Sequence, residues 1–239
     1  MNDKIVKFSL TLLLFIVSSC SNKSPVFGEN GMVVSTSRHA SQVGIDILQA
    51  GGNAVDAAAA VGFTLAVTSS SNGNIGGGGF MTAKLANGEI FTLDYREMAP
   101  KSANRDMYLD KDGNIIKGKS RSTHFASGVP GSVDGLLKAW GDYGSGVISR
   151  DQLMGPAIKL AREGFDLSKY EAERFNKNKE RLSKHSETKR IFTRDDRKWR
   201  KDDIFKQPDL ANTLERIAKN GRDGFYKGET AKLIVEEMK

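Results

Sequence analysis

The sequence predicts an α+β fold, and three patterns carry the prediction. Residues 80–95 contain two strand-like segments joined by Asn87-Gly88, which is a strong hairpin signal. Apolar residues at helical spacing occupy long stretches before and after this hairpin, at 37–67 and from 132 onward. Four consecutive glycines, Gly76–Gly79, precede the hairpin and allow another backbone or a ligand to approach closely.

The composition fits one globular domain or part of a larger one. The chain has 239 residues, of which 38% are hydrophobic and 27% charged, and its net charge is +7. Much of the basic excess lies in residues 177–206, where acidic residues are interleaved and no nucleic-acid motif accompanies the charge. We therefore expect a solvated face there and no nucleic-acid partner.

The first residues have the pattern of a bacterial lipoprotein leader. Lys4 and Lys7 precede an apolar stretch at 8–17 that is short for a transmembrane helix. It ends in Val17-Ser-Ser-Cys20, which resembles a lipobox. We expect residues 1–19 to be removed as a signal peptide, Cys20 to carry a lipid, and residues 20–30 to form a tether. The alternative is an ordinary secretory signal with a chance cysteine.

This interpretation places the protein in the periplasm, anchored to a bacterial membrane, and Ser21 after the cysteine favours the outer membrane. Cys20 is the only cysteine. The chain therefore forms no internal disulfide and offers no cysteine pair to a metal.

Two helices are predicted after a short strand at Gly31–Ser35. The first begins at Ser37 or His39 and ends at Ala50-Gly51-Gly52, where glycine supplies a left-handed cap. Asn53 is a good N-cap for the second, at 54–67, which is apolar all round and therefore buried. Asp56 near its start favours the helix dipole, so we assign it a structural role. His39 is predicted to be a packing histidine with satisfied hydrogen bonds.

The second predicted strand of the hairpin is followed directly by an arginine. In residues 89–95, Phe91, Leu93 and Tyr95 share one side, so this strand is predicted to be half-buried. Arg96 follows at its end. The glycine run before the hairpin is neither a phosphate-binding loop nor a dinucleotide fingerprint, because it leads into a strand and lacks a Gly-Lys-Ser/Thr sequence. On spacing alone, Arg96 is either a binding residue or a solvated cap.

The remainder is mostly helical by pattern. Asp110–Asn114 superficially resembles a calcium loop but lacks the terminal glutamate, so we interpret it as a surface turn and expect no metal site. Residues 103–108 are predicted to form one or two helical turns, 118–123 a mobile basic segment, and 191–204 a poorly periodic stretch. Ser132 is predicted to cap a helix that continues through Trp140. Further helices are predicted at 151–163, at 170–183, from Pro208 to Asn220, and at 229–238.

Four stretches, in this order, resemble the γ-glutamyltranspeptidase family. They are residues 39–60, Gly73-Asn-Ile-Gly-Gly-Gly-Gly-Phe-Met81, Tyr95-Arg-Glu-Met-Ala-Pro100 and Ala126-Ser-Gly-Val-Pro-Gly131. The resemblance covers residues 31–239 as the N-terminal part of the family's large subunit. It implies an N-terminal-nucleophile hydrolase αββα sandwich, incomplete here, with the hairpin in a central sheet. It also implies that Arg96 grips the α-carboxylate of a γ-glutamyl group, and Glu97 is a candidate to orient it.

The implied activity is that of a γ-glutamyltransferase or glutathione hydrolase. In the family a threonine, made N-terminal by self-cleavage, forms an acyl-enzyme that passes to water or to an acceptor amine. Ser122-Thr123-His124 resembles the nucleophile's surroundings, but the Ala126–Gly131 motif follows at once and places it in the large subunit, so we reject Thr123. The resemblance implies that the nucleophile lies beyond residue 239. The last helical pattern stops without a cap, which is typical of a truncated chain. The fragment alone is expected to be inactive.

The resemblance implies glutathione and other γ-glutamyl compounds as substrates, acceptor amino acids, peptides or water as acceptors, the small subunit as a partner, and no cofactor. Two alternatives stay open. A related acylase would act on cephalosporin or glutaryl side chains, which lack the free α-amino acid end. A truncated, non-catalytic lipoprotein remnant would serve only to bind.

Overall fold

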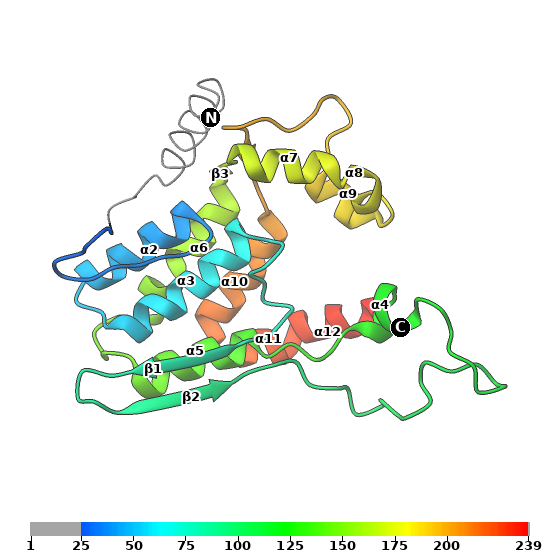
Figure 1. The fold of residues 1–239 in the computed structure, drawn as a ribbon, viewed down its shortest axis with the longest axis horizontal. Coiled ribbons are helices and arrows are strands. Elements are labelled where there is room, and N and C mark those ends of the chain that lie inside the picture. The colour runs from blue at the N-terminus through cyan, green and yellow to red at the C-terminus, as the bar shows by residue number, and fades with distance from the viewer. Residues whose placement is uncertain (1–24, 239) are drawn as a thin grey trace, which may run out of the picture. The chain divides into compact units, whose positions relative to one another are not determined.

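The computed structural model describes residues 25–238. The predicted signal peptide, Cys20 and the first part of the tether lie outside these residues. The chain divides after Met32 into two units, and residues 25–32 contain no helix or strand. The second unit is mainly helical, with four short strands (Figure 1). Its first helices are α2 (Arg38–Gln49) and α3 (Ala54–Thr68), followed by strands β1 (Phe80–Lys84) and β2 (Ile90–Asp94).

The elements after the hairpin are α4 (Lys119–Ser122), a 3-10 turn at His124–Ala126, α5 (Ser132–Tyr143), α6 (Arg150–Glu163), β3 (Phe165–Asp166), α7 (Lys169–Lys177), α8 (Lys179–Leu182), α9 (Ser186–Phe192), β4 (Ile204–Phe205), α10 (Pro208–Asn220), α11 (Asp223–Tyr226) and α12 (Gly228–Glu237). No helix within residues 25–238 is long and apolar enough to span a bilayer.

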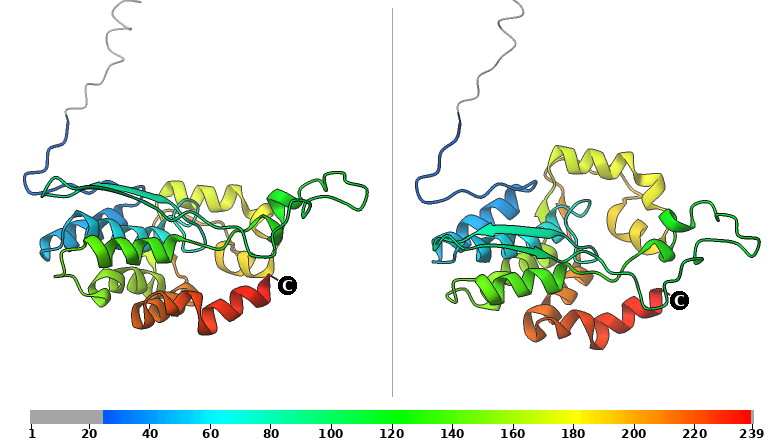
Figure 2. Two further views of the ribbon diagram at one scale, coloured as in Figure 1. Left: turned by 90° about the horizontal axis from the view of Figure 1, so that it is seen from below. Right: turned by 60° about the horizontal axis from the view of Figure 1, so that its bottom comes forward.

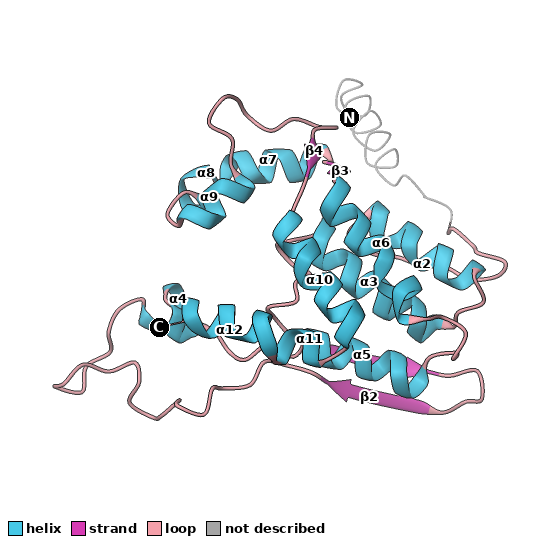
Figure 3. Ribbon diagram, turned by 180° about the vertical axis from the view of Figure 1, so that it is seen from behind, coloured by secondary structure: helices cyan, strands magenta, loops and turns pink. Residues whose placement is uncertain are grey.

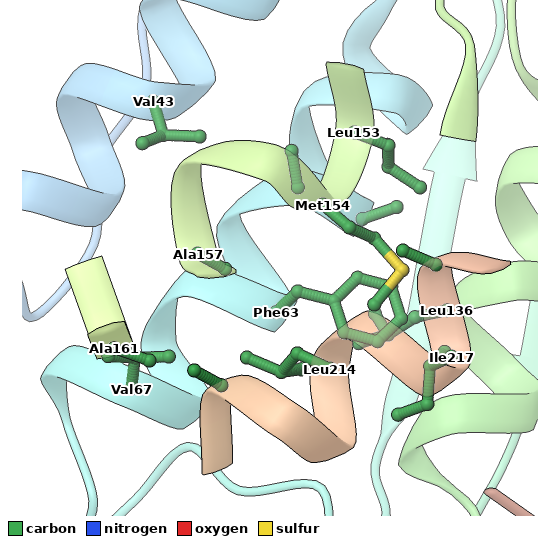
Figure 4. Packing of buried hydrophobic residues seen from close by; sticks show 14 of the residues in the cluster. Val43, Phe63, Val67, Leu136, Leu153, Met154, Ala157, Ala161, Leu214 and Ile217 are labelled. Atoms are coloured by element: carbon green, nitrogen blue, oxygen red, sulfur yellow. The ribbon is translucent and has the colours of Figure 1, made fainter. Parts of the chain in front are cut away.

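Helix α3 is the centre of the helical layer. It packs against α2, α5 and α6, and α10 packs in turn on α6. Phe63 and Val67 of α3 are fully buried, and the side chains of α6 and α10 surround them (Figure 4). The small residues of α3 permit these close contacts: a Cβ at Gly62 would lie 2.8 Å from the Leu136 side chain. The apolar pattern of residues 54–67 thus predicted this burial correctly.

Both ends of α3 are completed by hydrogen bonds. Asn53 and Asp56 form a capping box, in which Asp56 Oδ2 accepts from the Asn53 amide at 2.8 Å. The same oxygen accepts from the Ser145 amide at 2.9 Å, which ties the helix to the loop after α5. At the other end Gln207 Nε2 donates to the Val67 carbonyl at 2.8 Å. The structural role predicted for Asp56 is therefore confirmed.

The hairpin lies beside α5 in the views of Figure 2. Its strands pair antiparallel with Phe80 opposite Asp94. The Leu85 amide donates to the Glu89 carbonyl, and Gly88 adopts a left-handed φ of 89°, so the connection is a three-residue loop with glycine at its last position. Phe91 is buried as predicted, and its ring stacks on that of Tyr143 at 3.7 Å between centroids.

Residues 165–205 leave the helical core as α7, α8 and α9 and return through β4, which pairs with β3 (Figure 3). Rings from several elements pack where this segment rejoins the core. Phe205 contacts Phe175, Phe192 and Trp199 at centroid distances of 5.1, 5.5 and 5.6 Å. The Trp199 indole N–H donates to the Phe192 carbonyl at 2.9 Å.

Several predicted boundaries are wrong. Residues 31–35 form no strand with any described residue. Ser132 lies inside α5 instead of capping it, because the Gly77 carbonyl accepts from the amides of Gly131 and Ser132 and the helix starts at this contact. The helix predicted at 170–183 divides at Asn178, whose side chain donates to the Arg174 carbonyl.

The stretch 191–204 is mostly irregular, as its poor periodicity predicts, with the end of α9 and the start of β4 at its two ends. One further prediction about regular structure fails. Residues 103–108 form only turns.

Candidate functional site

Three segments that are distant in sequence meet around Arg96. The strand end at residues 95–98 lies between the glycine run and residues 128–132, which lead into α5. On one side the Tyr95 amide donates to the Gly79 carbonyl at 3.0 Å. On the other side Met98 and Val129 exchange two backbone hydrogen bonds of 3.0 and 2.7 Å. Three of the motifs that are separate in the sequence thus form one junction.

Glycine is required at this junction because backbones touch. A Cβ on Gly78 would lie 2.6 Å from the Tyr95 carbonyl oxygen and 2.7 Å from Arg96 Cα. A Cβ on Gly131 would lie 2.1 Å from the same carbonyl oxygen. The Gly77 carbonyl completes the contact by accepting from Gly131 and Ser132 at 2.8 and 3.0 Å. The sequence predicted a close approach at the glycine run, and the partner is the backbone that carries Arg96.

The Arg96 side chain is 64% exposed. Its amide donates to Asp94 Oδ1 at 2.9 Å, which fixes the backbone at the strand end. Its Nε lies 3.6 Å from Glu97 Oε2, and the guanidinium lies 5.9 Å from the centre of the Phe80 ring. Within residues 25–238 the guanidinium donates no hydrogen bond, so its fork is available to a carboxylate. The structure places Glu97 where it can contact the guanidinium, as predicted.

Tyr226 of α11 forms hydrogen bonds to the segment that leads from the junction into α5, and the sequence did not predict this contact. Its hydroxyl donates to the Pro130 carbonyl at 2.8 Å and accepts from the Asp134 amide at 3.3 Å. Partial burial raises the pKa of its phenol. Arg222 lies 4.8 Å over the ring and pairs with Asp134 at 2.6 Å. A tyrosine 96 residues away from its acceptor gives no local sequence signal.

In the part of the chain that the structure describes, no neighbour would activate Thr123. Its hydroxyl donates to the Lys119 carbonyl at 2.6 Å, closing the short helix α4. Among residues 25–238 no hydrogen bond joins Thr123 to His124, and both are exposed. A nucleophilic threonine needs a base within hydrogen-bond reach. The geometry therefore agrees with the rejection of Thr123.

His39 packs as predicted, but its hydrogen bonding was predicted wrongly. Its ring lies edge-on to Phe165 at 5.4 Å. Its buried Nε2 lies 3.3 Å from Asp166 Oδ1 without hydrogen-bond geometry, because Asp166 is turned toward Arg38. Burial and the adjacent Arg38 lower the pKa of this imidazole. The neutral ring is therefore a packing group at the start of α2.

A groove of about 610 Å³ runs beyond the Arg96 junction, between α12 and residues 100–130. Its lining is mostly apolar and includes Met107, Phe125, Val129, Ile234 and Val235. Within residues 25–238 no three His, Cys, Asp or Glu side chains are grouped to hold a metal ion.

Comparison with known proteins gives consistent likenesses. Residues 40–239 match the model of the family described as Gamma-glutamyltranspeptidase. The chain is 46% identical over 232 residues to a glutathione hydrolase proenzyme of Pseudomonas sp. (strain A14), a match that spans 97% of this chain and 40% of that relative. It is 42% identical to the crystal structure of Helicobacter pylori gamma-glutamyltranspeptidase, with a TM-score of 0.84 over 90% of this chain and 61% of that chain.

A more distant likeness is to cephalosporin acylase from Bacillus halodurans, at 27% identity and a TM-score of 0.72 over 90% of this chain and 40% of that chain. These structures confirm the predicted α+β fold of the N-terminal-nucleophile hydrolase class. The chain spans about 40% of the length of the first curated relative.

Proposed function

Because this chain belongs to the γ-glutamyltranspeptidase family, we propose that it supplies the carboxylate-binding part of a γ-glutamyltransferase or glutathione hydrolase. The enzyme transfers the γ-glutamyl group of glutathione and related amides to water or to acceptor amines. The nucleophile is a threonine in the part of the family's sequence that these 239 residues do not span, and self-cleavage of a proenzyme exposes it. That part, the small subunit included, is the proposed partner.

One observation carries this proposal: the exposed guanidinium of Arg96 is held on a backbone that is fixed on both sides. A planar guanidinium binds a carboxylate through two parallel hydrogen bonds, which favours the α-carboxylate of a γ-glutamyl group over a neutral group. The fixed backbone reduces the entropy lost on binding. Glu97 at 3.6 Å limits the directions in which the guanidinium can turn.

A chimera tests the proposal. Residues 31–239 are joined to the complementary part of the Pseudomonas sp. (strain A14) relative, and release of a chromogenic amine from a γ-glutamyl anilide is measured. Arg96→Lys is expected to lower kcat/KM by about tenfold to a hundredfold, because one charge-assisted hydrogen bond contributes about 1.5–3 kcal/mol. Arg105→Lys is the matched control, because Arg105 is exposed and, among residues 25–238, has a single acidic neighbour within 4.0 Å, Asp106 at 3.9 Å. Equal kcat/KM for Arg96→Lys and wild type would refute the assignment.

The same chimera separates the proposed activity from that of an acylase. A glutaryl anilide retains the distal carboxylate but lacks the α-amino group. The proposal expects faster turnover of the γ-glutamyl anilide. Preference for the glutaryl anilide would instead favour the acylase function, which the likeness to cephalosporin acylase keeps as the second candidate.

For its location, we propose a lipid anchor at Cys20 that holds the protein at the periplasmic side of a bacterial membrane, with the outer membrane favoured. The support is the sequence Val17-Ser-Ser-Cys20 after a short apolar stretch. Cys20→Ala is expected to leave the protein unlipidated, either soluble or with its leader uncleaved. Mass spectrometry of the wild-type N-terminus measures this, and an unmodified mature N-terminus other than Cys20 would contradict the proposal.

A further inference from the structure

Almost all of the chain's net charge lies in one part of the fold. Residues 177–206, from the end of α7 through α8 and α9 to the end of the returning loop, contain twelve Lys or Arg and six Asp or Glu. Their net charge of +6 compares with +7 for all 239 residues. The sequence alone suggested that interleaved acids neutralise this charge at the surface.

The structure shows that the acidic side chains of residues 177–206 pair with some of the basic residues and not with others. Asp203 lies within 4.0 Å of both Arg194 and Arg197. Asp195 is likewise shared by Lys179 and Lys189. Bases of α8, of α9 and of the loop that follows α9 therefore take most of the available carboxylates.

Three basic residues between the end of α7 and the start of α9 are left without partners. Lys177, Arg181 and Lys184 are exposed, and none lies within 4.0 Å of an acidic oxygen among residues 25–238. Lys177 ends α7, Arg181 lies in α8, and Lys184 lies in the turn between α8 and α9, so the three lie within eight residues of the chain. Glu180 lies in the same segment but forms no ion pair with them within 4.0 Å. We call Lys177, Arg181 and Lys184 the basic stripe.

We propose that the basic stripe binds the anionic headgroups of a phospholipid bilayer, as a second membrane contact beside the lipid proposed at Cys20. The charge of the stripe is complementary to phosphate-bearing headgroups, and lysine and arginine near such a surface each strengthen binding. The thirteen residue steps from Cys20 to Val33 reach at most about 45 Å, which is long enough for a face of the folded unit to meet the bilayer. A lipid combined with a basic patch gives firmer attachment than either alone.

Vesicle binding by the mature chain, residues 20–239 with Cys20→Ala, isolates the electrostatic contact. Sedimentation is compared between vesicles of phosphatidylcholine and vesicles containing about one third phosphatidylglycerol. We expect binding only to the anionic vesicles and its loss on raising NaCl from 0.1 to about 0.5 M, because salt screens such contacts. Changing all three stripe residues to Gln is expected to weaken partitioning by about tenfold to a hundredfold.

The matched control changes Lys84, Lys219 and Lys232 to Gln. These lysines are exposed, lie on β1, α10 and α12, and have no acidic oxygen within 4.0 Å of their Nζ among the described residues. The control removes the same charge and is expected to weaken binding no more than about threefold. Absence of wild-type binding to anionic vesicles would overturn the proposal. Equal losses of vesicle binding in the two triple variants would also overturn it, because binding would then depend on net charge and not on the basic stripe. Neither outcome depends on γ-glutamyl turnover.

Discussion

Replacing Gly78 with alanine tests whether the Arg96 junction depends on direct backbone contact. The added Cβ would lie 2.6 Å from the Tyr95 carbonyl oxygen and 2.8 Å from the Glu97 amide nitrogen, and neither atom belongs to a side chain that can rotate away. The glycine run and the strand end must therefore separate. Overpacking of this kind costs about 1–3 kcal/mol. For a chain of this length, a loss of about 2 kcal/mol lowers Tm by roughly 4–8 °C.

The same glycine run provides the control. A Cβ at Gly76 would meet only Asn74 Oδ1, at 3.5 Å, which is an ordinary van der Waals contact. Gly76→Ala is therefore expected to leave Tm within about 1–2 °C of wild type or to raise it slightly, since alanine restricts the unfolded chain. Thermal unfolding followed by circular dichroism compares the two variants. Equal Tm values for Gly78→Ala and Gly76→Ala would show that the junction adapts freely and would refute the reasoning.

Three further outcomes are expected. Ion pairing with Arg197 holds the pKa of Asp203 well below its ordinary value. The stabilising effect of Asp203 is therefore present above about pH 4 and is lost as the pH falls further. The difference in urea-unfolding free energy between wild type and Asp203→Asn should close below pH 4, and a widening difference would contradict this. Tyr226→Phe leaves the Pro130 carbonyl without its donor and should cost about 1–2 kcal/mol, measured as a fall in Tm of roughly 2–8 °C. Thr123→Ala should leave anilide turnover by the chimera unchanged, and a loss of activity would reinstate Thr123 as a nucleophile.

Local patterns predicted local structure well. The mostly apolar pattern of residues 54–67, the N-cap Asn53 and the alternation around Phe91 each depend on neighbours in sequence, and the structure confirms all three. Arg96 was found at a strand end because the alternating pattern stops there. Helix α10 was predicted from Pro208 to Asn220 for the same reason, since its start, face and end are all encoded within thirteen residues.

Features that depend on distant contacts were not predictable. The start of α5 was misplaced because the Gly77 carbonyl, more than fifty residues earlier, accepts its first amides. Tyr226 was missed because its acceptor lies 96 residues away. The unequal sharing of carboxylates in residues 177–206 was also invisible, since composition counts charges but does not show which atoms meet. The missing hydrogen bond of His39 also depends on a residue distant in sequence, because Asp166 pairs with Arg38 instead.

The hydrogen bonds at the two ends of α3 have a consequence for how this molecule opens. Ordinary helices fray from their ends, and their terminal amides exchange with solvent hydrogen without unfolding of the rest. Here the Ser145 amide and the Gln207 side chain fasten opposite ends of α3 from sites 89 and 140 residues away along the chain. Opening either end therefore requires a distant segment to detach as well. Amide exchange along α3 should be governed by cooperative unfolding of the helical core, which makes this helix the slowest-exchanging segment against which local opening elsewhere can be compared.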